Sequence, residues 1–543
     1  MEERKGFGSN FGFLMAAVGS AVGLGNIWGF PNKMGACGGF TFLIIYLILA
    51  VCCGFIVMVG ELAIGRKTGK GAVAAYKALS KKFSWMGWMG ILSAFFILFF
   101  YCALGGYCIK YVVLNVGDLF GAGFGASAIA AASADAASAS LGDAVFGAFM
   151  SSTTEAIIYG LIFVVLTMLI VLGGVGGGIE KVCSVGMPAL FVALLICIIR
   201  ACTLDGVDTT VQVLQADGSL VEHVIHGSAL DGLKYMFAPG WATENGYYVP
   251  ASAVIDGVKM SAVEINGVMQ RIVTFKQETP DVLTVLATAG GQMFFSLSLG
   301  MAAMITYGSY MDKKKNLQKN AVVIVVMDTV VALMAGLCVI PGRFALDPTG
   351  NLGGPSLLFV TMQNVFDRMG SVGPIFGIMF YLLVVFAAVS SSISLLEAVV
   401  AHFVDKAREQ GKGDKRKAYS VLAGIAAGIL CVIVCLDSMG TAGISPADIL
   451  GMRGTMEKLP TWSADWLDFF DCIAEGILMP LGALLMSIMY GWEIGPGVVR
   501  DEIEHDEGHK MFGYTFFKIC IKYVTPVCMV LVLYGQIKEF FFV

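Results

Sequence analysis

The sequence comprises 543 residues, of which 57% are hydrophobic and only 14% are charged, and its formal net charge is −5. Soluble domains carry about a quarter charged residues, so this composition excludes an ordinary soluble protein and indicates one that resides in a lipid bilayer. The near-neutral balance argues against a nucleic-acid partner. The five histidines form no credible catalytic constellation, which argues against an enzyme, and the i, i+4 pair His505 and His509 is typical of a solvated loop.

Eleven apolar segments have the length of about 20 residues that a helix needs to cross a bilayer. The predicted spans are residues 10–31, 40–64, 86–115, 154–173, 183–203, 283–310, 320–341, 371–402, 419–437, 468–491 and 515–537. Basic residues follow spans two, six and eight, within 66–82, 313–319 and 406–417. Because positive loops stay inside the cell, we expect a cytoplasmic N-terminus and an extracytoplasmic C-terminus. The chain has no N-x-S/T sequon, which is typical of a bacterial inner (plasma) membrane protein.

Two predicted outer loops, 117–153 and 204–279, are long. The first is rich in Ala, Gly and Ser, a composition compatible with a small-residue helix or a flexible linker. In the second, apolar and polar residues alternate around Asp217-Gly218, which predicts a hairpin, and residues 247–275 have a similar pattern. We expect a small β-rich extracellular insertion here, and a lineage-specific surface elaboration is its simplest interpretation.

Two of the predicted spans contain residues that do not favour a continuous helix. The stretch VGSAVGLGNIWGFP (18–31) has four glycines, and QMFFSLSLGMAAMITYGSY (292–310) has two serines and a glycine at its centre. The interruptions lie five spans apart, which predicts two inverted repeats with a binding site near the midplane. Freed backbone carbonyls suit a hard cation, and freed N–H groups suit a carboxylate. Close helix packing is the alternative reason for the glycines, although it does not explain Asn26, which is costly in lipid without a partner.

These two stretches resemble the first and sixth helices of the neurotransmitter:sodium symporter family. Further similar segments are GELAIGR (60–66), FYCALGGYCIKY (100–111), FAAVSSSISLLEA (386–398) and LDFFD (467–471). The resemblance implies an all-α polytopic membrane protein with the 5+5 inverted-repeat leucine-transporter fold and discontinuous helices 1 and 6. A single transporter domain would then contain helices 1–5 (10–203), the extracellular insertion (204–279), helices 6–10 (283–491) and helix 11 (515–537).

The resemblance also implies two sodium sites made of oxygen ligands, as a hard cation requires. The first would use the Ala21 carbonyl, Asn26, Ser296 and Asp328, together with the substrate carboxylate. The second would use the carbonyls of Gly19, Val22 and Ala387 and the hydroxyls of Ser390 and Ser391. Without the resemblance, these serines would be expected to bond carbonyls of their own helix.

Asp328 lies in the middle of a predicted span with no basic residue nearby in the sequence. A carboxylate in that position must be paired, protonated or metal-bound. Chloride-dependent members of the family have a serine four residues further on, where this chain has Ala332. We infer that Asp328 itself supplies the negative charge, so that chloride is not required. A protonated aspartate with a structural role is the alternative.

By the same resemblance, the substrate cavity would be lined by Ala21, Gly23, Gly25, Ile97, Tyr101, Phe295, Ser298, Met301, Ser391 and Leu395. Relatives that transport amines have an aspartate at the position of Gly23, so glycine there implies an amino acid zwitterion whose carboxylate would contact Tyr101. Met301 replaces an aromatic residue. Because methionine adapts to larger ligands, it favours a bulky hydrophobic or aromatic amino acid, although methionine on an apolar helix is also ordinary core.

The resemblance assigns gating to Arg4, Asp405 and Tyr310 on the inner side and to Gln292 and Asp468 on the outer side. The arginine usual in the outer gate is replaced by Gly29. The outer gate would therefore close through packing of Phe295 on Tyr101, or through the outer insertions.

We therefore predict a sodium-coupled secondary symporter that imports a neutral hydrophobic or aromatic amino acid by alternating access. The alternative is a sodium-dependent sensor that binds the amino acid without net transport, and the missing gate arginine is its support. The expected partners are the amino acid, two sodium ions and the lipid bilayer, and the oligomeric state is left open.

Overall fold

The computed structural model describes residues 7–132, 140–214, 220–239, five short strands within 253–273, and residues 281–346, 357–413, 415–453, 456, 458–505 and 509–542. Within these residues, nine helices are long and apolar enough to cross a membrane, and a tenth span consists of two helices bent by 47°. Ten of the eleven predicted spans coincide with these helices, which confirms a polytopic helical membrane protein. The other one, predicted at 283–310, begins with the shorter apolar helix Val282–Ser296, which is followed by a break. All fourteen cysteines have free thiols.

The first five predicted spans correspond to these elements: α1 (Asn10–Ala21), η1 (Gly25–Gly29) and α2 (Phe30–Ala36); α3 (Phe40–Leu49), η2 (Ala50–Gly54) and α4 (Phe55–Thr68); α6 (Met86–Leu119); α9 (Thr153–Leu172); η3 (Val175–Ile179) and α10 (Glu180–Cys202). The fifth span begins eight residues before its predicted start at 183. Its three glycines stay helical and Pro188 lies inside the helix, because a membrane helix tolerates weak formers when its backbone groups stay paired.

The remaining spans correspond to α13 (Val282–Ser296) and α14 (Ala303–Gly308); α15 (Leu317–Leu346); η5 (Gly370–Val372) and α17 (Gly373–Glu409); α18 (Arg416–Asp437); α21 (Trp466–Asp471), η6 (Cys472–Leu478), α22 (Met479–Ile488) and η7 (Met489–Glu493); α24 (Tyr514–Ile519), η8 (Cys520–Val524) and α25 (Thr525–Phe541). The shorter connecting helices are α5 (Ala72–Leu79), α7 (Ala126–Ala132), α8 (Leu141–Ser151), α11 (Ala229–Phe237), η4 (Leu357–Thr361), α16 (Met362–Arg368), α19 (Pro446–Ile449), α20 (Thr461–Ala464) and α23 (Gly497–Ile503).

Both predicted helix interruptions are present. The first separates α1 from η1, where Val22 has an extended backbone with φ −74° and ψ 105°. The second separates α13 from α14, and there Ser298, Gly300 and Ala302 all have positive φ angles of 54°, 76° and 63°. The Gly300 N–H donates a 2.7 Å hydrogen bond to Oε1 of the buried Glu61, so an intramembrane carboxylate holds the second break. The prediction of discontinuous helices 1 and 6 is therefore confirmed.

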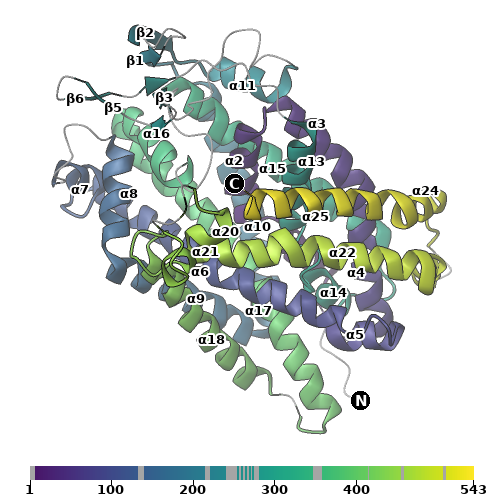
Figure 1. Cartoon of the computed structure of the whole chain (residues 1–543). Helices are drawn as coiled ribbons and strands as arrows, with labels where there is room; N and C mark the ends of the chain where they lie inside the picture. Colours follow the sequence, from purple (N-terminus) through teal and green to yellow (C-terminus); the bar gives the residue numbers. More distant parts are fainter. Residues whose placement is uncertain are drawn as a thin grey trace.

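The segment between α10 and α13 contains all the strands that the structure describes: β1 (Asp208–Leu214), β2 (Leu220–His226), β3 (Ala253–Ile255), β4 (Val258–Met260), β5 (Val263–Ile265), β6 (Val268–Gln270) and β7 (Ile272–Val273). Sheet order is β2-β1-β7, with separate antiparallel pairs β3-β4 and β5-β6. Antiparallel pairing of Leu214 with Leu220 closes the β1–β2 ladder; the predicted turn at 217–218 lies outside the described residues. The strands gather at one end of the molecule, and α5 lies at the other (Figure 1).

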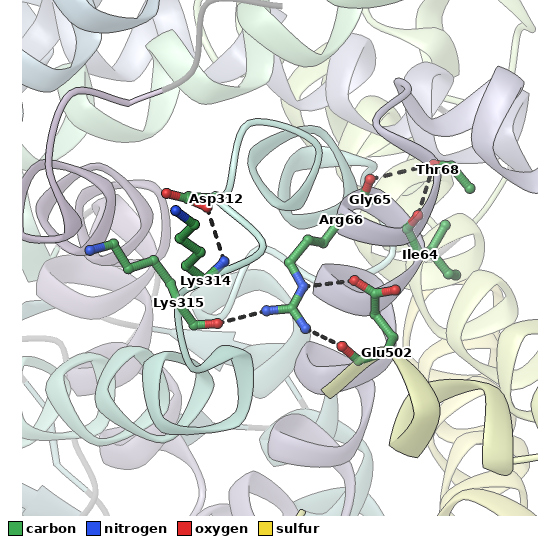
Figure 2. Close-up of polar contacts among 8 residues, drawn as sticks. All are labelled: Ile64, Gly65, Arg66, Thr68, Asp312, Lys314, Lys315 and Glu502. Carbon is green, nitrogen blue, oxygen red and sulfur yellow. Dashed lines mark hydrogen bonds and ion pairs between the residues drawn. The ribbon is translucent and has the colours of Figure 1, made fainter. Parts of the chain in front are cut away.

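Arg66, predicted to lie in the loop after span two, belongs to the last turn of α4 and is buried rather than solvated. Arg66 is 3% exposed and donates from Nε to Glu502 Oε1 at 2.9 Å and from Nη1 to the Lys315 carbonyl at 2.7 Å (Figure 2). The guanidinium therefore joins the end of α4 to the loop after α14 and to α23. Its fork of donors explains an arginine here, since a lysine would satisfy fewer acceptors.

Candidate functional site

The two helix breaks lie against each other, and each supplies hydrogen-bond partners for the other. The Ser298 hydroxyl donates to the Ser20 carbonyl at 2.7 Å, and the Gln292 amide donates to the Gly25 carbonyl at 2.6 Å. Carbonyls freed by the first break are thus satisfied by side chains of the sixth span. This arrangement creates a polar zone inside an otherwise apolar bundle, as broken membrane helices require.

One group of polar side chains surrounds Asp328, which is fully buried on α15. Asn26 Nδ2 donates to Asp328 Oδ1 at 2.7 Å, and the Ser296 hydroxyl donates to Oδ2 at 2.9 Å. The Tyr46 hydroxyl is 3.4 Å from the same carboxylate oxygen. Asn26 Oδ1 accepts from the Gly23 N–H at 3.0 Å, which ties this group to the first break. Asp328 forms no ion pair within the part of the chain that the structure describes, so its side-chain hydrogen-bond partners there are all neutral groups.

A second group of oxygens lies between the first break and α17. The Ser390 hydroxyl is 3.3 Å from the Val22 carbonyl and 2.9 Å from the Ala387 carbonyl. The Ser391 hydroxyl is 3.3 Å from the carbonyls of both Gly19 and Val22. Oxygens at right angles around one hard cation, each about 2.4 Å from it, lie about 3.4 Å apart. The four separations given above, each between a serine hydroxyl and a backbone carbonyl, are of this size or shorter.

The ten residues predicted to contact substrate surround one cavity between the breaks, α6 and α17. Its lining consists of Ala21, Gly23, Gly25, Ile97, Tyr101, Phe295, Ser298, Met301, Ser391 and Leu395, together with Ser20. The lining contains no charged side chain. The cavity measures about 10 Å³, which is room for about one water molecule. A larger ligand therefore requires movement of the side chains that line it.

Tyr101 closes one side of this cavity. Its hydroxyl accepts a 2.7 Å hydrogen bond from the Leu24 N–H, and its ring lies 6.3 Å from that of Phe295. A Cβ atom at Gly23 would lie 2.2 Å from both the Tyr101 and Ser391 hydroxyl oxygens. Position 23 therefore has no space for a side chain, and the wall of the cavity at this point is backbone.

On the predicted outer side of the cavity, an ion pair lies one helical turn beyond Gly29. Gln292 Oε1 lies 2.9 Å from where a Cβ atom of Gly29 would stand. The Lys33 ammonium pairs with Glu475 on η6, whose side chain is 4% exposed. Asp468, seven residues before Glu475, donates its N–H to Asp465 Oδ1 at 2.7 Å. The helix-1-to-helix-10 contact is therefore ionic although the arginine is missing.

On the predicted inner side, Tyr310 and Arg416 both contact the buried carboxylate of Glu397. The Tyr310 hydroxyl donates to Glu397 Oε1 at 2.6 Å, and Arg416 donates to both oxygens of the same carboxylate. Asp405 Oδ2 accepts a 2.8 Å hydrogen bond from the Gly71 N–H. Arg4, the predicted partner of Asp405, lies outside the described residues.

Several polar residues of this region were not predicted from the sequence to be site residues. They are Ser20, Lys33, Tyr46, Glu61, Glu397, Arg416 and Glu475. Glu61 and Glu397 carried a usable signal, since an intramembrane carboxylate is expensive without a function or a partner. No such sequence signal marked Tyr46 or Lys33, because their partners lie about 280 and 440 positions away along the chain.

Comparison with known proteins places this geometry in a family. A family model for the sodium:neurotransmitter symporter family matches residues 4–123 and 247–541. The sodium-dependent transporter YhdH of Bacillus subtilis is 29% identical over 529 residues, 96% of each chain. A sodium-dependent transporter of Haemophilus influenzae is 26% identical over an alignment of 549 positions, which covers 99% of each chain.

A solved structure is similar over the same length. The crystal structure of MhsT in complex with L-phenylalanine has a TM-score of 0.73 and 28% identity, and the match covers 98% of this chain and 100% of MhsT. The predicted leucine-transporter fold with two discontinuous helices is confirmed by this match. With the family model matching most of its length, the chain belongs to the sodium:neurotransmitter symporter family, whose members are sodium-dependent membrane transporters.

Proposed function

We propose that this protein imports a neutral amino acid with a hydrophobic or aromatic side chain, together with two sodium ions, by alternating access. The observation that carries the proposal is the uncharged cavity between two broken helices, bordered by two groups of oxygen atoms that have no basic partner. Such a cavity suits a ligand whose own charges cancel, because a net charge buried without a partner costs several kcal/mol.

The carboxylate of the substrate has two expected partners. It would accept a hydrogen bond from Tyr101 and would share the sodium ion held near Asp328. Gly23 leaves no space for the acidic side chain that a bare amine would need. The side chain of the substrate would contact Ile97, Met301 and Leu395, which form the apolar part of the lining. MhsT, solved with L-phenylalanine, supports an aromatic or large aliphatic side chain.

Two sodium ions would occupy the two oxygen groups. The first ion would be held by Asn26, Ser296, Asp328 and the Ala21 carbonyl, and the second by the Ser390 and Ser391 hydroxyls with three backbone carbonyls. Asp328 provides a full negative charge next to the first ion, and Ala332 offers no hydroxyl for an anion. Transport would therefore proceed without chloride.

The Lys33–Glu475 pair would take the place of the missing outer-gate arginine. Lys33 lies on the same helix as Gly29, four residues on, and Glu475 lies on the same span as Asp468. Breaking this pair would free the outer half of helix 1 from helix 10. Packing of Phe295 against Tyr101 would form a separate closure, over the cavity itself. On the inner side, the contacts of Glu397 and of Asp405 would separate when the cavity opens inward.

The ionic gradient is sufficient for accumulation. Two charges crossing 100 mV provide about 4.6 kcal/mol before any sodium gradient is counted. At 1.4 kcal/mol per decade, this supports more than three decades of amino acid accumulation. The expected setting is a bacterial plasma membrane, with the N-terminus inside, the C-terminus outside and the strand-bearing segment of residues 204–279 on the outer surface.

The test is uptake of labelled tryptophan, phenylalanine, leucine and alanine into proteoliposomes with an inside-negative potential. Sodium is compared with choline, and chloride with gluconate. We expect sodium-dependent accumulation above equilibrium for the larger amino acids, equally in chloride and gluconate. Sodium-dependent binding without accumulation would instead support the sensor, in which the pocket is retained and the transport cycle is lost.

A further inference from the structure

A second cavity, of about 450 Å³, is lined in part by α5. This helix lies at the end of the molecule opposite the strands (Figure 1). Two helix faces form most of its wall. One carries Lys70, Val73 and Lys77, spaced i, i+3 and i+7 on or just before α5, and the other carries His402, Lys406 and Glu409 in the last turns of α17. These spacings place each set on one side of its helix. Trp88, near the start of α6, completes the wall.

The cavity has more cationic groups than its carboxylates neutralise. Lys70 and Glu409 form an exposed pair at 3.4 Å, and Asp405 accepts the Gly71 N–H at 2.8 Å. Among the residues that the structure describes, Lys77 and Lys406 form no ion pair. His402 is 7% exposed, and its Nε2 has no hydrogen-bond partner within the described part of the chain. The lining has three ammonium groups, those of Lys70, Lys77 and Lys406, against the two carboxylates of Asp405 and Glu409. One positive charge in excess on facing helices, beside the buried ring of His402, favours the binding of an anion.

The surroundings indicate what carries that anion. Trp88 is 42% exposed and Phe403 is 37% exposed, and Trp85 on the same side is 49% exposed. The Trp88 and His402 rings meet edge to face with centroids 4.6 Å apart. Exposed aromatic rings at the ends of two membrane spans are typical of the level of the lipid headgroups. Lysines at this level reach toward phosphates while their stems cover apolar surface.

We propose that this cavity binds a phosphate group, and that an anionic membrane phospholipid supplies it. Lys77 and Lys406 would hold the phosphate from two different helices, and the exposed rings would contact the upper acyl chains. The volume lies within the range of about 300–1,000 Å³ typical of small-molecule sites. The lipid would join the loop after span two to the end of α17. The proposal requires only that the protein spans a membrane, so it stands apart from the choice of substrate.

The experiment places the full chain in phosphatidylcholine vesicles that contain either dibrominated phosphatidylglycerol or dibrominated phosphatidylcholine. Bromine quenches nearby tryptophan, and the signal of Trp88 is the difference between the full chain and a Trp88→Phe variant. We expect dibrominated phosphatidylglycerol to quench Trp88 with about fivefold higher affinity than dibrominated phosphatidylcholine. This is the preference expected of roughly one uncompensated lysine at a membrane surface. Lys77→Gln with Lys406→Gln should reduce the preference to about one. Lys81→Gln with Lys82→Gln removes the same charge from the same loop outside the cavity and should leave the preference within twofold.

Equal quenching by the two lipids in the unmodified chain would overturn the proposal. An equal loss in both double variants would also overturn it, because the attraction would then be a general surface effect. If millimolar inorganic phosphate abolishes the phosphatidylglycerol preference, the ligand is a soluble anion and the lipid assignment is wrong. Should the Lys77/Lys406 double variant not fold, Lys406→Gln alone must still lower the preference at least twofold.

Discussion

The charge of Asp328 can be tested without changing the shape of the site. In Asp328→Asn, the new amide oxygen can still accept from Asn26 or Ser296, and the new Nδ2 can donate to a Ser296 or Tyr46 oxygen. The variant therefore keeps the hydrogen-bonded group and loses only the negative charge. Asparagine also has the shape of a protonated aspartate. The substitution therefore distinguishes an ionised Asp328 that binds sodium from a protonated Asp328 with a structural role.

The expected magnitude follows from electrostatics. At an effective dielectric constant of about 20, a carboxylate about 2.5 Å from a sodium ion contributes roughly 6–7 kcal/mol before desolvation is subtracted. Removing one partner of a buried charge pair costs about 2–5 kcal/mol in measured cases. Taking the lower bound, sodium affinity should fall at least about 30-fold, at 1.4 kcal/mol per decade.

The assay is the sodium concentration that gives half-maximal amino acid binding to purified protein, with thermal stability measured in parallel. Asp437→Asn is the matched control, because Asp437 is a 1% exposed carboxylate that accepts the Trp466 N–H away from both oxygen groups. An unchanged sodium requirement in Asp328→Asn would refute the reasoning, since a protonated structural aspartate would then explain the site equally well.

Three further substitutions test other parts of the site. Gly23→Ala places a Cβ atom 2.2 Å from the Tyr101 hydroxyl, so the apparent KM for the amino acid should rise at least tenfold in an uptake assay, and an unchanged KM would contradict the packing argument. Ser391→Ala should raise the sodium concentration for half-maximal uptake several-fold. Ser392→Ala should not, because the Ser392 hydroxyl donates to a carbonyl of its own helix at 3.0 Å. Equal effects of the two substitutions would contradict the proposed second sodium site. Lys33→Met should speed release of bound amino acid to the outer side in a washout measurement while Lys33→Arg preserves the slow rate, and identical rates would exclude an ionic outer gate.

The residues that line the cavity could be predicted from the sequence because nine of the ten lie within short motifs that resemble the family, and Ile97 lies three residues before one of them. The ten residues come from four segments, and the structure adds only Ser20 to the lining of the cavity. Their contacts across the chain depend on the two helix breaks, which are visible as glycines and serines in otherwise apolar spans. A local signal was therefore enough to locate a non-local site.

The outer ion pair could not be predicted in the same way. The sequence shows that Gly29 lacks a charge, and from this we expected a gate closed by packing or by the insertions. Lys33 in fact meets Glu475, and this pairing depends on the rotation of α2 relative to η6, which no pattern within either segment encodes. Arg66 is a similar case, because its position in a basic loop predicts solvation and its acceptors come from two distant segments.

The sequence by itself determined the membrane environment, the approximate limits of most spans, and the places where two helices break. It could do so because hydrocarbon imposes length, apolarity and backbone pairing on each span separately. Only the tertiary structure decided which polar groups of different spans meet: Tyr46 with Asp328, Glu61 with Gly300, and Lys33 with Glu475. Those pairings depend on how the helices rotate and pack, and the energy that selects them is shared among contacts hundreds of residues apart.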